Sequence, residues 1–321
     1  MVFGCSETET PEALPVQSPV NEPLQPISVI VVNHNAGELL LECVAVALQQ
    51  AMQVIVIDNL STDLSIDNLS AQFTQQPRLQ LIRSAKNVGF AAGCNIGIAS
   101  ATHALLLFIN PDTILGAGSL RRLAQVMDSE PSVGMVGGLL TNVDGSEQAG
   151  GRRAVPTPWR SFVRAFGLNI MSGWWPKLFF DFNLHTQPLP TTPIDVEAIS
   201  GALMLVRRIA LDDVGRWDDA YFLHCEDLDW CMRFRHKGWR ILFVPDAPAL
   251  HHQGHSSRIR PLFVEWHKHK GMVRFYRKFF AHQYPGVLMG FVGLAVWLRF
   301  SGLFIGHWIK LAWSRLRGWR V

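Results

Sequence analysis

The stretch Ile27-Ser28-Val29-Ile30-Val31-Val32-Asn33-His34-Asn35 decides the fold class of this chain. Its first six residues are nearly all apolar and mostly β-branched, which predicts a strand buried on both faces of a sheet. Similar runs predict strands at 53–58, 79–82 and 104–109, and helical patterns separate them at 38–50, about 61–73 and 90–100. Strand and helix alternating at this spacing predict an α/β fold with a doubly wound, mostly parallel sheet flanked by helices.

The composition is that of a protein with a substantial core and little net charge. The chain has 321 residues, of which 48% are apolar, and its formal charge is +3. This charge gives no general case for nucleic-acid binding. Five cysteines without regular spacing favour a reducing cytosol. Residues 1–25 are rich in Pro, Glu, Thr and Ser, so we expect a disordered lead-in and no secretory signal.

One domain is expected at 26–277, with a regular pattern up to residue 138 and a looser one from 139 onward. Residues 150–193 are dominated by Arg, Pro, Trp and Phe with no clean period. A long irregular segment inside a compact domain is usually functional or mobile. Regular structure is expected to return as strands within 194–206 and 240–244, with a short helix at 209–214 between them.

The tail, 278–321, differs in kind from the rest of the chain. Its uncharged run 286–298 is too short to span about 30 Å of hydrocarbon, and extending it brings in Arg299, His307 and Lys310. At 100° per residue these three share one stripe with Ser314 and Arg317, away from Phe304, Trp308 and Leu311. This pattern favours an amphipathic helix lying in an anionic membrane interface; the alternative is a helix packed on the protein's own core.

Two acidic sites stand out against this background. Asn110-Pro111-Asp112 directly follows the apolar run 104–109, and a carboxylate at the end of a buried parallel strand lies where open α/β sheets bind ligands. Farther on, Glu226, Asp227 and Asp229 crowd the start of a predicted helix. Repulsion between these carboxylates costs stability, so their presence indicates a site that uses a carboxylate for chemistry. The alternative is an acidic first helical turn that interacts favourably with the helix dipole.

Taken together, the ordered motifs resemble a family 2 glycosyltransferase of the GT-A fold, rhamnosyltransferase-like branch. The matching blocks lie at 28–35, 56–63, 87–97, 110–112, 200–202 and 226–227. No single block would suffice, but their order and spacing are specific. The resemblance covers roughly 26–277 and implies a nucleotide-sugar half at about 26–138 and an acceptor half at about 139–277.

The resemblance implies a donor site for a nucleotide-diphosphate sugar. The site for such a donor must stack on its base, accept hydrogen bonds from its ribose hydroxyls and supply cationic charge to its diphosphate. The base and ribose contacts would come from the first loop and the end of the second strand, and the diphosphate and sugar contacts from later blocks. The implied residues are Asn33, His34, Asn35, Asp58, Asn87, Gly93, Asn95, Asn110, Asp112 and Gly201. The 87–97 block also offers helix amides that could face a phosphate.

The same resemblance implies a metal and a catalytic base. Asp112, with Asn110 in place of the usual first acidic residue, would bind Mg²⁺ or Mn²⁺ together with His251. Asp227 is expected to be the base, with Glu226 beside it. The residues Trp217, Asp218 and Asp219 are expected to shape the acceptor pocket, with ordinary core packing as the alternative for Trp217.

The predicted function is an inverting, metal-dependent transfer of a sugar to a lipid-linked or other cell-envelope glycan. The favoured sugar is rhamnose, with dTDP-rhamnose as the donor. The protein would work at the cytosolic face of a membrane, attached through its tail, with 159–190 as a mobile cover over the acceptor. The alternatives are another donor (UDP-galactofuranose, UDP-glucose or UDP-N-acetylglucosamine) and a non-catalytic membrane-surface binding protein. A nicotinamide-dependent oxidoreductase is disfavoured because the turn after the first strand lacks the glycine-rich fingerprint.

Overall fold

A computed structural model describes residues 23–165, 167–175, 182–252 and 260–318. The predicted disordered lead-in therefore lies almost entirely outside the described residues. The strands of the fold are β1 (Gln25–Asn33), β2 (Ala51–Asp58), β3 (Leu79–Arg83), β4 (Leu105–Ile109), β5 (Thr113–Leu115), β6 (Val133–Thr141), β7 (Arg152–Arg153), β8 (Ile194–Asp195), β9 (Ala198–Ile199), β10 (Leu203–Arg207) and β11 (Arg240–His251). The α-helices are α1 (Leu39–Gln50), α2 (Ser65–Gln72), α3 (Phe90–Ser100), α4 (Ser119–Ser129), α5 (Pro158–Ala165), α6 (Arg208–Val214), α7 (Glu226–His236), α8 (Pro261–Phe280) and α9 (Gly286–Gly318), with short 3₁₀ turns η1 (Leu168–Gly173) and η2 (Leu184–Thr186).

The main sheet has the order β3-β2-β1-β4-β10-β6-β11-β5, with β8 added beside β11. The predicted strands β1 to β4 are present and parallel, which confirms the α/β class. The direction then changes, because β10 is antiparallel to both of its neighbours, β4 and β6. The sheet is therefore mixed rather than wholly parallel, and a strand from the second half of the chain lies in its centre.

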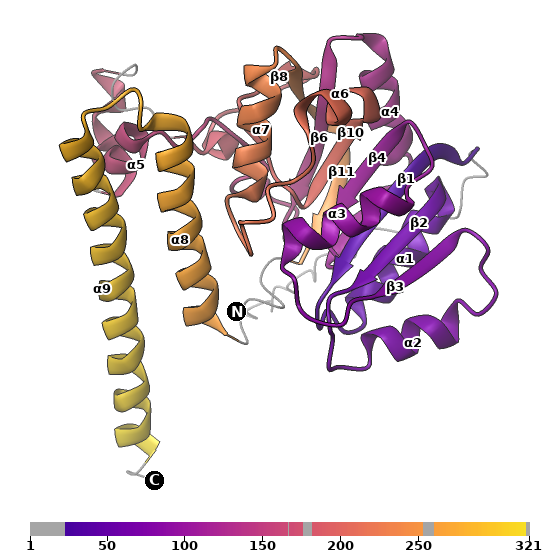
Figure 1. Ribbon diagram of the computed structural model, residues 1–321, viewed down its shortest axis with the longest axis horizontal. Coiled ribbons are helices and arrows are strands. Elements are labelled where there is room, and N and C mark those ends of the chain that lie inside the picture. The colour runs from indigo at the N-terminus through magenta and orange to yellow at the C-terminus, as the bar shows by residue number, and fades with distance from the viewer. Residues whose placement is uncertain (1–22, 166, 176–181, 253–259, 319–321) are drawn as a thin grey trace, which may run out of the picture.

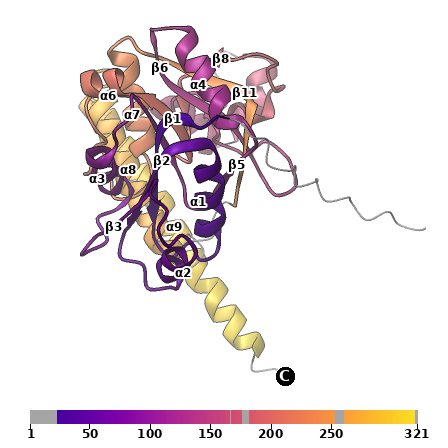
Figure 2. The same cartoon turned by 90° about the vertical axis from the view of Figure 1, so that its right-hand side faces the viewer.

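Helices cover both faces of the sheet (Figures 1 and 2). Alternate residues of β1 show the two layers: Val29 and Val31 pack with α1, whereas Ile30 and Val32 pack with α3. The first core also takes in α2 and α4, and the second takes in α6, α7 and α8. Strands with both faces buried read as continuous apolar runs, which is why the sequence showed them so clearly.

The tail forms one continuous helix, α9, that packs on α8 and then extends beyond it (Figure 1). The helix is longer than the uncharged run 286–298, which alone is too short to cross a membrane. The stretch Gly286–Lys310 is long and apolar enough by length and composition, and none of its apolar window is buried. One such helix is weak evidence by itself. Gly302 and Gly306, which weaken an isolated helix, do not interrupt α9.

Candidate active site

The candidate site lies where β1, β2 and β4 end at the same edge of the sheet. Asn33 ends β1 and Asp58 ends β2, and these two residues pair in register. Asn110 directly follows β4, whose neighbour β1 is parallel to it. Because the carboxyl ends of parallel strands meet at one edge, three of the predicted donor motifs are brought together.

The first loop is held by its own polar side chains. Asn33 is fully buried and its amide donates to Ser61 Oγ and Ser65 Oγ, each at 2.9 Å. Asn35, in a left-handed conformation at φ 58°, accepts from the backbone of Thr62 at 2.7 Å. Asn33 and Asn35, both predicted to contact the donor, therefore fix the conformation of the loop after β1. His34 remains half-exposed, with Nδ1 3.1 Å from the carbonyl of Asn59, and stays a prediction for the base contact.

Asn59 joins the second loop to the 87–97 block and was not singled out by the sequence. Its buried amide donates to Asn87 Oδ1 at 2.9 Å and to the Gly89 carbonyl at 3.2 Å, and it accepts from Val88 at 2.8 Å. Asp58 is 8% exposed and accepts from Ser61 N at 2.9 Å. The residue predicted to bind the ribose, Asp58, thus lies beside a loop that Asn59 fixes.

The start of α3 is closed by protein rather than left open for a phosphate. Phe90 N donates to the Phe222 carbonyl at 2.9 Å, and Gly89 N donates to Asn87 Oδ1 at 3.0 Å. Gly93 faces β1, where an added Cβ would lie 2.7 Å from Val32 Cγ1. The first amide of α3 is therefore used within the protein, a phosphate contact from this helix stays a prediction, and Gly93 packs closely between helix and sheet.

The predicted metal residues are brought together by strand pairing. β11 runs antiparallel to β5 and places His251 opposite Thr113, next to Asp112. His251 Nε2 lies 3.3 Å from Asp112 Oδ1 and 3.4 Å from Asn110 Nδ2. Both Asp112 and His251 are 8% exposed. Residues far apart in the sequence thus form one compact pair of potential ligands.

Gln148 holds the imidazole and was not predicted from the sequence. Its Oε1 lies 2.6 Å from His251 Nδ1, while its Nε2 donates to Asn142 Oδ1 at 3.1 Å and to the His251 carbonyl at 3.3 Å. Since Oε1 can only accept, Nδ1 carries a proton, which leaves Nε2 directed toward Asp112. Two acceptors 3.3 Å apart need a cation or a proton between them.

These donors fit a divalent ion of the Mg²⁺ or Mn²⁺ type. Asp112 offers carboxylate oxygen and His251 offers a neutral imidazole, and a donor diphosphate would complete an oxygen-rich shell. Among the described residues, no group of three or more His, Cys, Asp and Glu side chains is placed to hold a metal by itself. The site therefore depends on the substrate for the remaining ligands.

The predicted base, Asp227, is the second residue of α7 and follows a strained turn. His224 and Cys225 have φ values of 67° and 70°, which are uncommon for residues with a Cβ and cost about 1–3 kcal/mol each. Helix α8 presses on this turn, since an added Cβ on Gly271 would lie 2.8 Å from the His224 carbonyl. The packing of α8 therefore helps to hold the turn that presents Glu226 and Asp227.

Asp227 forms an ion pair with Arg153, a residue that the sequence showed only as part of an arginine-rich segment. Arg153 Nη2 contacts Asp227 Oδ2, and both side chains are largely buried. Arg153 lies on β7, which pairs with β9 and thereby reaches α7. Despite the cost of burial, the charge of Asp227 raises the pKa of Arg153, so the guanidinium stays charged.

Glu226 differs from its neighbour in its surroundings. Burial, and then the charge of Asp227, raise the pKa of Glu226 well above the usual carboxyl range. Its Oε2 has no hydrogen-bond partner among the described residues. The two adjacent carboxyl groups thus differ in their surroundings: burial favours the protonated form of Glu226, whereas Asp227 is paired with Arg153.

The short segment Gly201–Ala202 joins the base to the metal residues. Gly201 N donates to Asp227 Oδ2 at 3.3 Å, and the Ala202 carbonyl accepts from Asn110 N at 3.2 Å. Asp227 and Asn110 therefore flank two small residues. A sugar that bridges the two sites would pass over this segment.

The three consecutive residues predicted for the acceptor pocket have different surroundings. Trp217 is 3% exposed and packs against Phe108 and Trp230, which corrects the expectation that its ring lines an acceptor pocket. Asn95, predicted to bind the donor, instead holds the Trp217 backbone through hydrogen bonds of 2.9 and 3.1 Å. The remaining two are Asp218, bound by Arg274 and Lys278 of α8, and Asp219, which is exposed.

The predicted cover, 159–190, is only partly described, because residues 166 and 176–181 lie outside the described residues. Its described part includes most of α5 together with η1 and η2. The Tyr276 hydroxyl of α8 donates to Ser161 Oγ of α5 at 2.7 Å, so α5 is attached to the helical layer. A covering role over the acceptor stays a prediction.

The sequence comparisons agree with this geometry. Residues 28–214 match the family described as Glycosyl transferase family 2, so the chain belongs to that family and is a glycosyltransferase. It is 28% identical to the N-acetylglucosaminyl-diphospho-decaprenol L-rhamnosyltransferase of Mycobacterium tuberculosis, over 72% of this chain and 77% of that protein. It is also 27% identical to Rhamnosyltransferase WbbL of Escherichia coli K12, over 53% of this chain and 63% of that protein.

Solved structures confirm the GT-A fold. The mannosyltransferase PcManGT of Pyrobaculum calidifontis, in complex with GDP-Man and Mn²⁺, superposes with a TM-score of 0.52 and 16% identity, over 88% of this chain and 72% of that one. GalNAc-T7, solved with UDP, GalNAc and Mn²⁺, gives a TM-score of 0.54 and 16% identity, over 72% of this chain and 44% of that one. At this identity the likeness concerns the fold alone.

Proposed function

We propose that the protein transfers rhamnose from dTDP-rhamnose to a lipid-linked glycan of the cell envelope, with inversion at the anomeric carbon. The observation that carries the proposal is the arrangement around Gly201–Ala202. Asp227, paired with Arg153, accepts from Gly201 N, and Asn110, next to the Asp112–His251 pair, donates to the Ala202 carbonyl. A base and a diphosphate site joined by two small residues suit displacement at one carbon.

In this reaction Asp227 accepts the proton of the acceptor hydroxyl as its oxygen attacks the anomeric carbon. The bond from that carbon to the diphosphate oxygen breaks, and its electron pair leaves with the diphosphate. Arg153 orients the carboxylate, while Glu226, neutral and buried behind it, adds no second charge. Asp227 thus has an oriented oxygen available for the proton.

Asp112 and His251 would hold the Mg²⁺ or Mn²⁺ ion. When bound, such an ion neutralises the charge of a departing diphosphate. Gln148 keeps the His251 lone pair directed at the ion, and Asn110 donates to the same region. Two observations support the proposed need for a metal ion. Asp112 Oδ1 and His251 Nε2 face each other, and the two structures of similar fold contain Mn²⁺.

The donor and acceptor assignments rest on the relatives. Both named relatives are rhamnosyltransferases, and the mycobacterial name specifies a diphospho-decaprenol acceptor. A lipid-linked acceptor also suits a protein whose α9 presents exposed apolar residues. We place the enzyme peripherally on the cytosolic face of the membrane. The domain assignment that goes with this is a donor half, 26–138, an acceptor half, 139–277, and an attachment tail, 278–321.

The direct test is transfer from labelled dTDP-rhamnose to N-acetylglucosaminyl-diphospho-polyprenol in the presence of Mn²⁺. The proposal expects a rhamnosylated lipid whose new linkage has the configuration opposite to that of the donor, as read by NMR. Transfer from a UDP-sugar instead would replace the donor assignment. Folded protein that turns over none of the donors but still binds vesicles would favour the non-catalytic alternative.

A further inference from the structure

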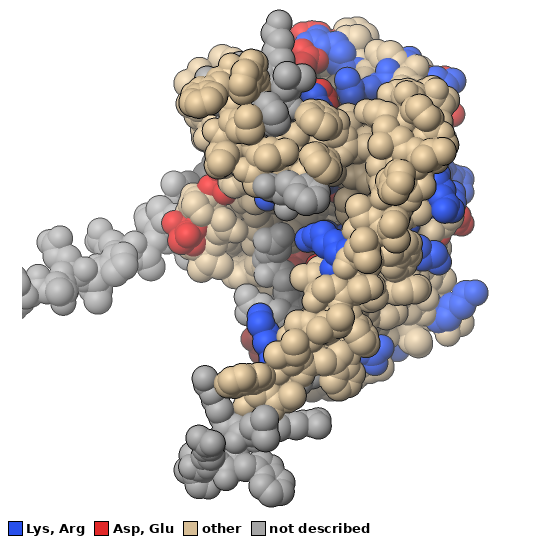
Figure 3. Space-filling view, turned by 90° about the vertical axis from the view of Figure 1, so that its left-hand side faces the viewer, with Lys and Arg blue, Asp and Glu red and all other residues tan. Residues whose placement is uncertain are grey.

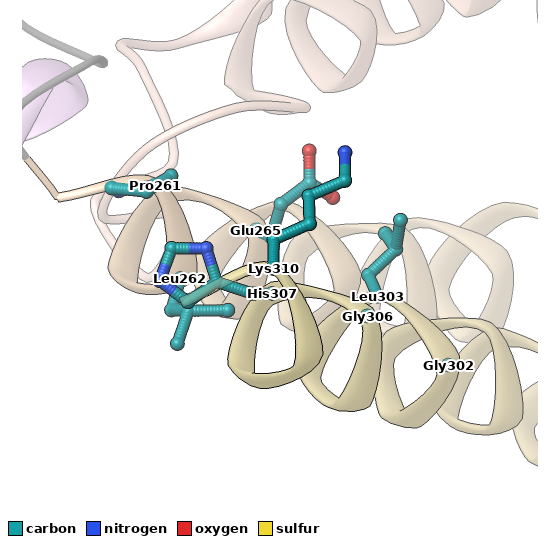
Figure 4. Close-up of a pocket in the computed structure, with 8 residues that line it drawn as sticks. All are labelled: Pro261, Leu262, Glu265, Gly302, Leu303, Gly306, His307 and Lys310. Atoms are coloured by element: carbon teal, nitrogen blue, oxygen red, sulfur yellow. The ribbon is translucent and has the colours of Figure 1, made fainter. Parts of the chain in front are cut away.

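The polar stripe of α9 lies on the side of the helix that faces α8. Arg299 Nη1 lies 3.2 Å from His269 Nε2 of α8. Burial lowers the pKa of His269, so its neutral ring accepts from Arg299 while Nδ1 donates to the Glu265 carbonyl at 2.7 Å. His307 and Lys310 line a pocket with Glu265, between the two helices (Figure 4). These polar residues therefore lie on the side of α9 next to α8, and Arg299 and Lys310 stay exposed at its edge.

The opposite face of α9 is apolar along its length. Its exposed large residues include Val287 (75%), Phe291 (62%), Leu298 (62%), Ile305 (58%) and Ile309 (52%). At 100° per residue these five fall within about 40° of one another. Figure 3 shows this side of the molecule, where α9 is mainly covered by uncharged residues. A ridge of this kind is far longer than the apolar patches of ordinary monomers.

A second apolar element lies on the same side of the molecule. Ile170 in η1 is 86% exposed and Trp174, directly after it, is 81% exposed, which are among the largest values for apolar side chains in the described residues. The Ser161–Tyr276 hydrogen bond attaches α5, and with it η1, to α8 near the turn into α9 (Figure 1). Two elements separated by more than a hundred residues thus expose apolar side chains together.

The charge of these elements indicates the occupant. Residues 150–180 contain no acidic residue, and residues 266–321 contain ten Lys and Arg and no Asp or Glu. A basic apolar surface with tryptophans suits an anionic bilayer, in which tryptophan lies at headgroup level and Lys and Arg meet anionic lipids. The apolar stretch of α9, 25 residues or about 37 Å long, would lie along the bilayer surface.

We propose that η1 with Trp174 and the outer face of α9 form one docking surface for an anionic lipid bilayer, with α9 attached to α8 through the Arg299–His269 contact. This inference deepens the proposed function, on which it rests for the lipid-linked acceptor. Because α8 also packs on the His224–Cys225 turn, docking sets the orientation of the catalytic centre relative to the membrane. The acceptor then reaches Asp227 from the bilayer that both elements contact.

The test is flotation of the full chain with phosphatidylcholine–phosphatidylglycerol vesicles, without donor or metal. One double variant, Ile170→Ser with Trp174→Ser, removes the η1 contact, and another, Phe291→Ser with Leu298→Ser, removes the α9 contact. Each is expected to lower the vesicle partition coefficient at least about tenfold, given the apolar area lost. The matched control is Leu64→Ser with Ile209→Ser, at residues 67% and 66% exposed elsewhere on the protein, and it should bind as the wild type does.

Three results would overturn the proposal: wild-type protein that does not float, an η1 variant that binds fully, or apolar variants that change only the oligomeric state in light scattering. The last would assign the surface to a second copy of the chain. Thermal unfolding checks that each variant folds, and the exposure of the altered residues favours this outcome. Donor binding in the absence of vesicles is measured separately, so failure of membrane docking and failure of the proposed activity are distinguishable.

Discussion

His251 Nε2 lies 3.3 Å from Asp112 Oδ1, although the two residues are far apart in the sequence. The distance is that of two ligands of one ion, and Gln148 directs the imidazole lone pair into the gap. Imidazole ligands are commonly oriented by such outer partners. The proposed metal site would therefore draw on three elements: the loop after β4, the end of β11 and the segment after β6.

Replacing Gln148 by leucine should weaken Mn²⁺ binding about 10- to 100-fold, because the His251 ring loses the acceptor that fixes its orientation. Electron paramagnetic resonance of free Mn²⁺ in the presence of the donor diphosphate measures this directly. Gln148→Glu, which keeps an acceptor for Nδ1, is the matched control and should bind Mn²⁺ at least as well as the wild-type protein does. Equal affinity for Gln148→Leu and wild type would exclude the orienting role.

Asp227→Asn should lower the transfer rate at least about 10²- to 10⁴-fold, because an amide cannot accept the acceptor proton. Donor binding should remain within a few-fold, since Asp227 contacts Arg153, Gly201 and its own helix. Initial rates and calorimetric donor titration give the two values. Asp128→Asn, at an exposed position of α4, is the control. A parallel loss of donor affinity in Asp227→Asn would make this residue part of the scaffold.

Arg153→Leu should reduce both stability and transfer, since the carboxylate of Asp227 is left largely buried without its partner. The expected loss of unfolding free energy is about 1–3 kcal/mol, with Arg153→Lys recovering part of it. Denaturant unfolding supplies the measurement. Arg122→Leu breaks the exposed pair with Asp246, which should cost about 1 kcal/mol or less. Similar losses for the two leucine variants would mean that the Arg153 pair is energetically an ordinary surface contact.

Glu226→Gln should stabilise the protein increasingly as the pH rises. The pKa of Glu226 is raised in the folded state, so the folded protein holds this proton more tightly than the unfolded chain does. The stability that this group supplies is present below its unfolded pKa and is lost as the pH rises through the folded value. The difference in Tm, variant minus wild type, should therefore grow from about pH 5 to about pH 8. A constant difference would show that Glu226 ionises normally.

The strands and the acidic motifs could be predicted because their signals are local. β1, β2 and β4 are buried on both faces, so each reads as a continuous apolar run, and polar residues mark the edge where they end. The antiparallel β10 could not be placed in the same way. Its position between β4 and β6 depends on a long return of the chain rather than on its own residues.

Arg153 and Gln148 were not predicted because they act from irregular structure. Both lie in the segment after β6, where no period marks an element, and only a concentration of arginines gave a signal. The stripe of α9 shows a different limit. The sequence placed Arg299, His307 and Lys310 on one stripe, but period alone does not tell whether that stripe meets water or another helix. In the structure Arg299 contacts His269 of α8 while remaining exposed.

Donor and metal use are measured most directly by a thermal-shift panel of dTDP-rhamnose, UDP-galactofuranose, UDP-glucose and UDP-N-acetylglucosamine, each with and without Mn²⁺. A ligand at about 100 times its Kd adds about 2.7 kcal/mol to stability, which is enough to detect. We predict selective stabilisation by dTDP-rhamnose that requires Mn²⁺ and is lost in Asp112→Asn. Stabilisation by a UDP-sugar alone, or equal stabilisation without the metal, would contradict the proposed function.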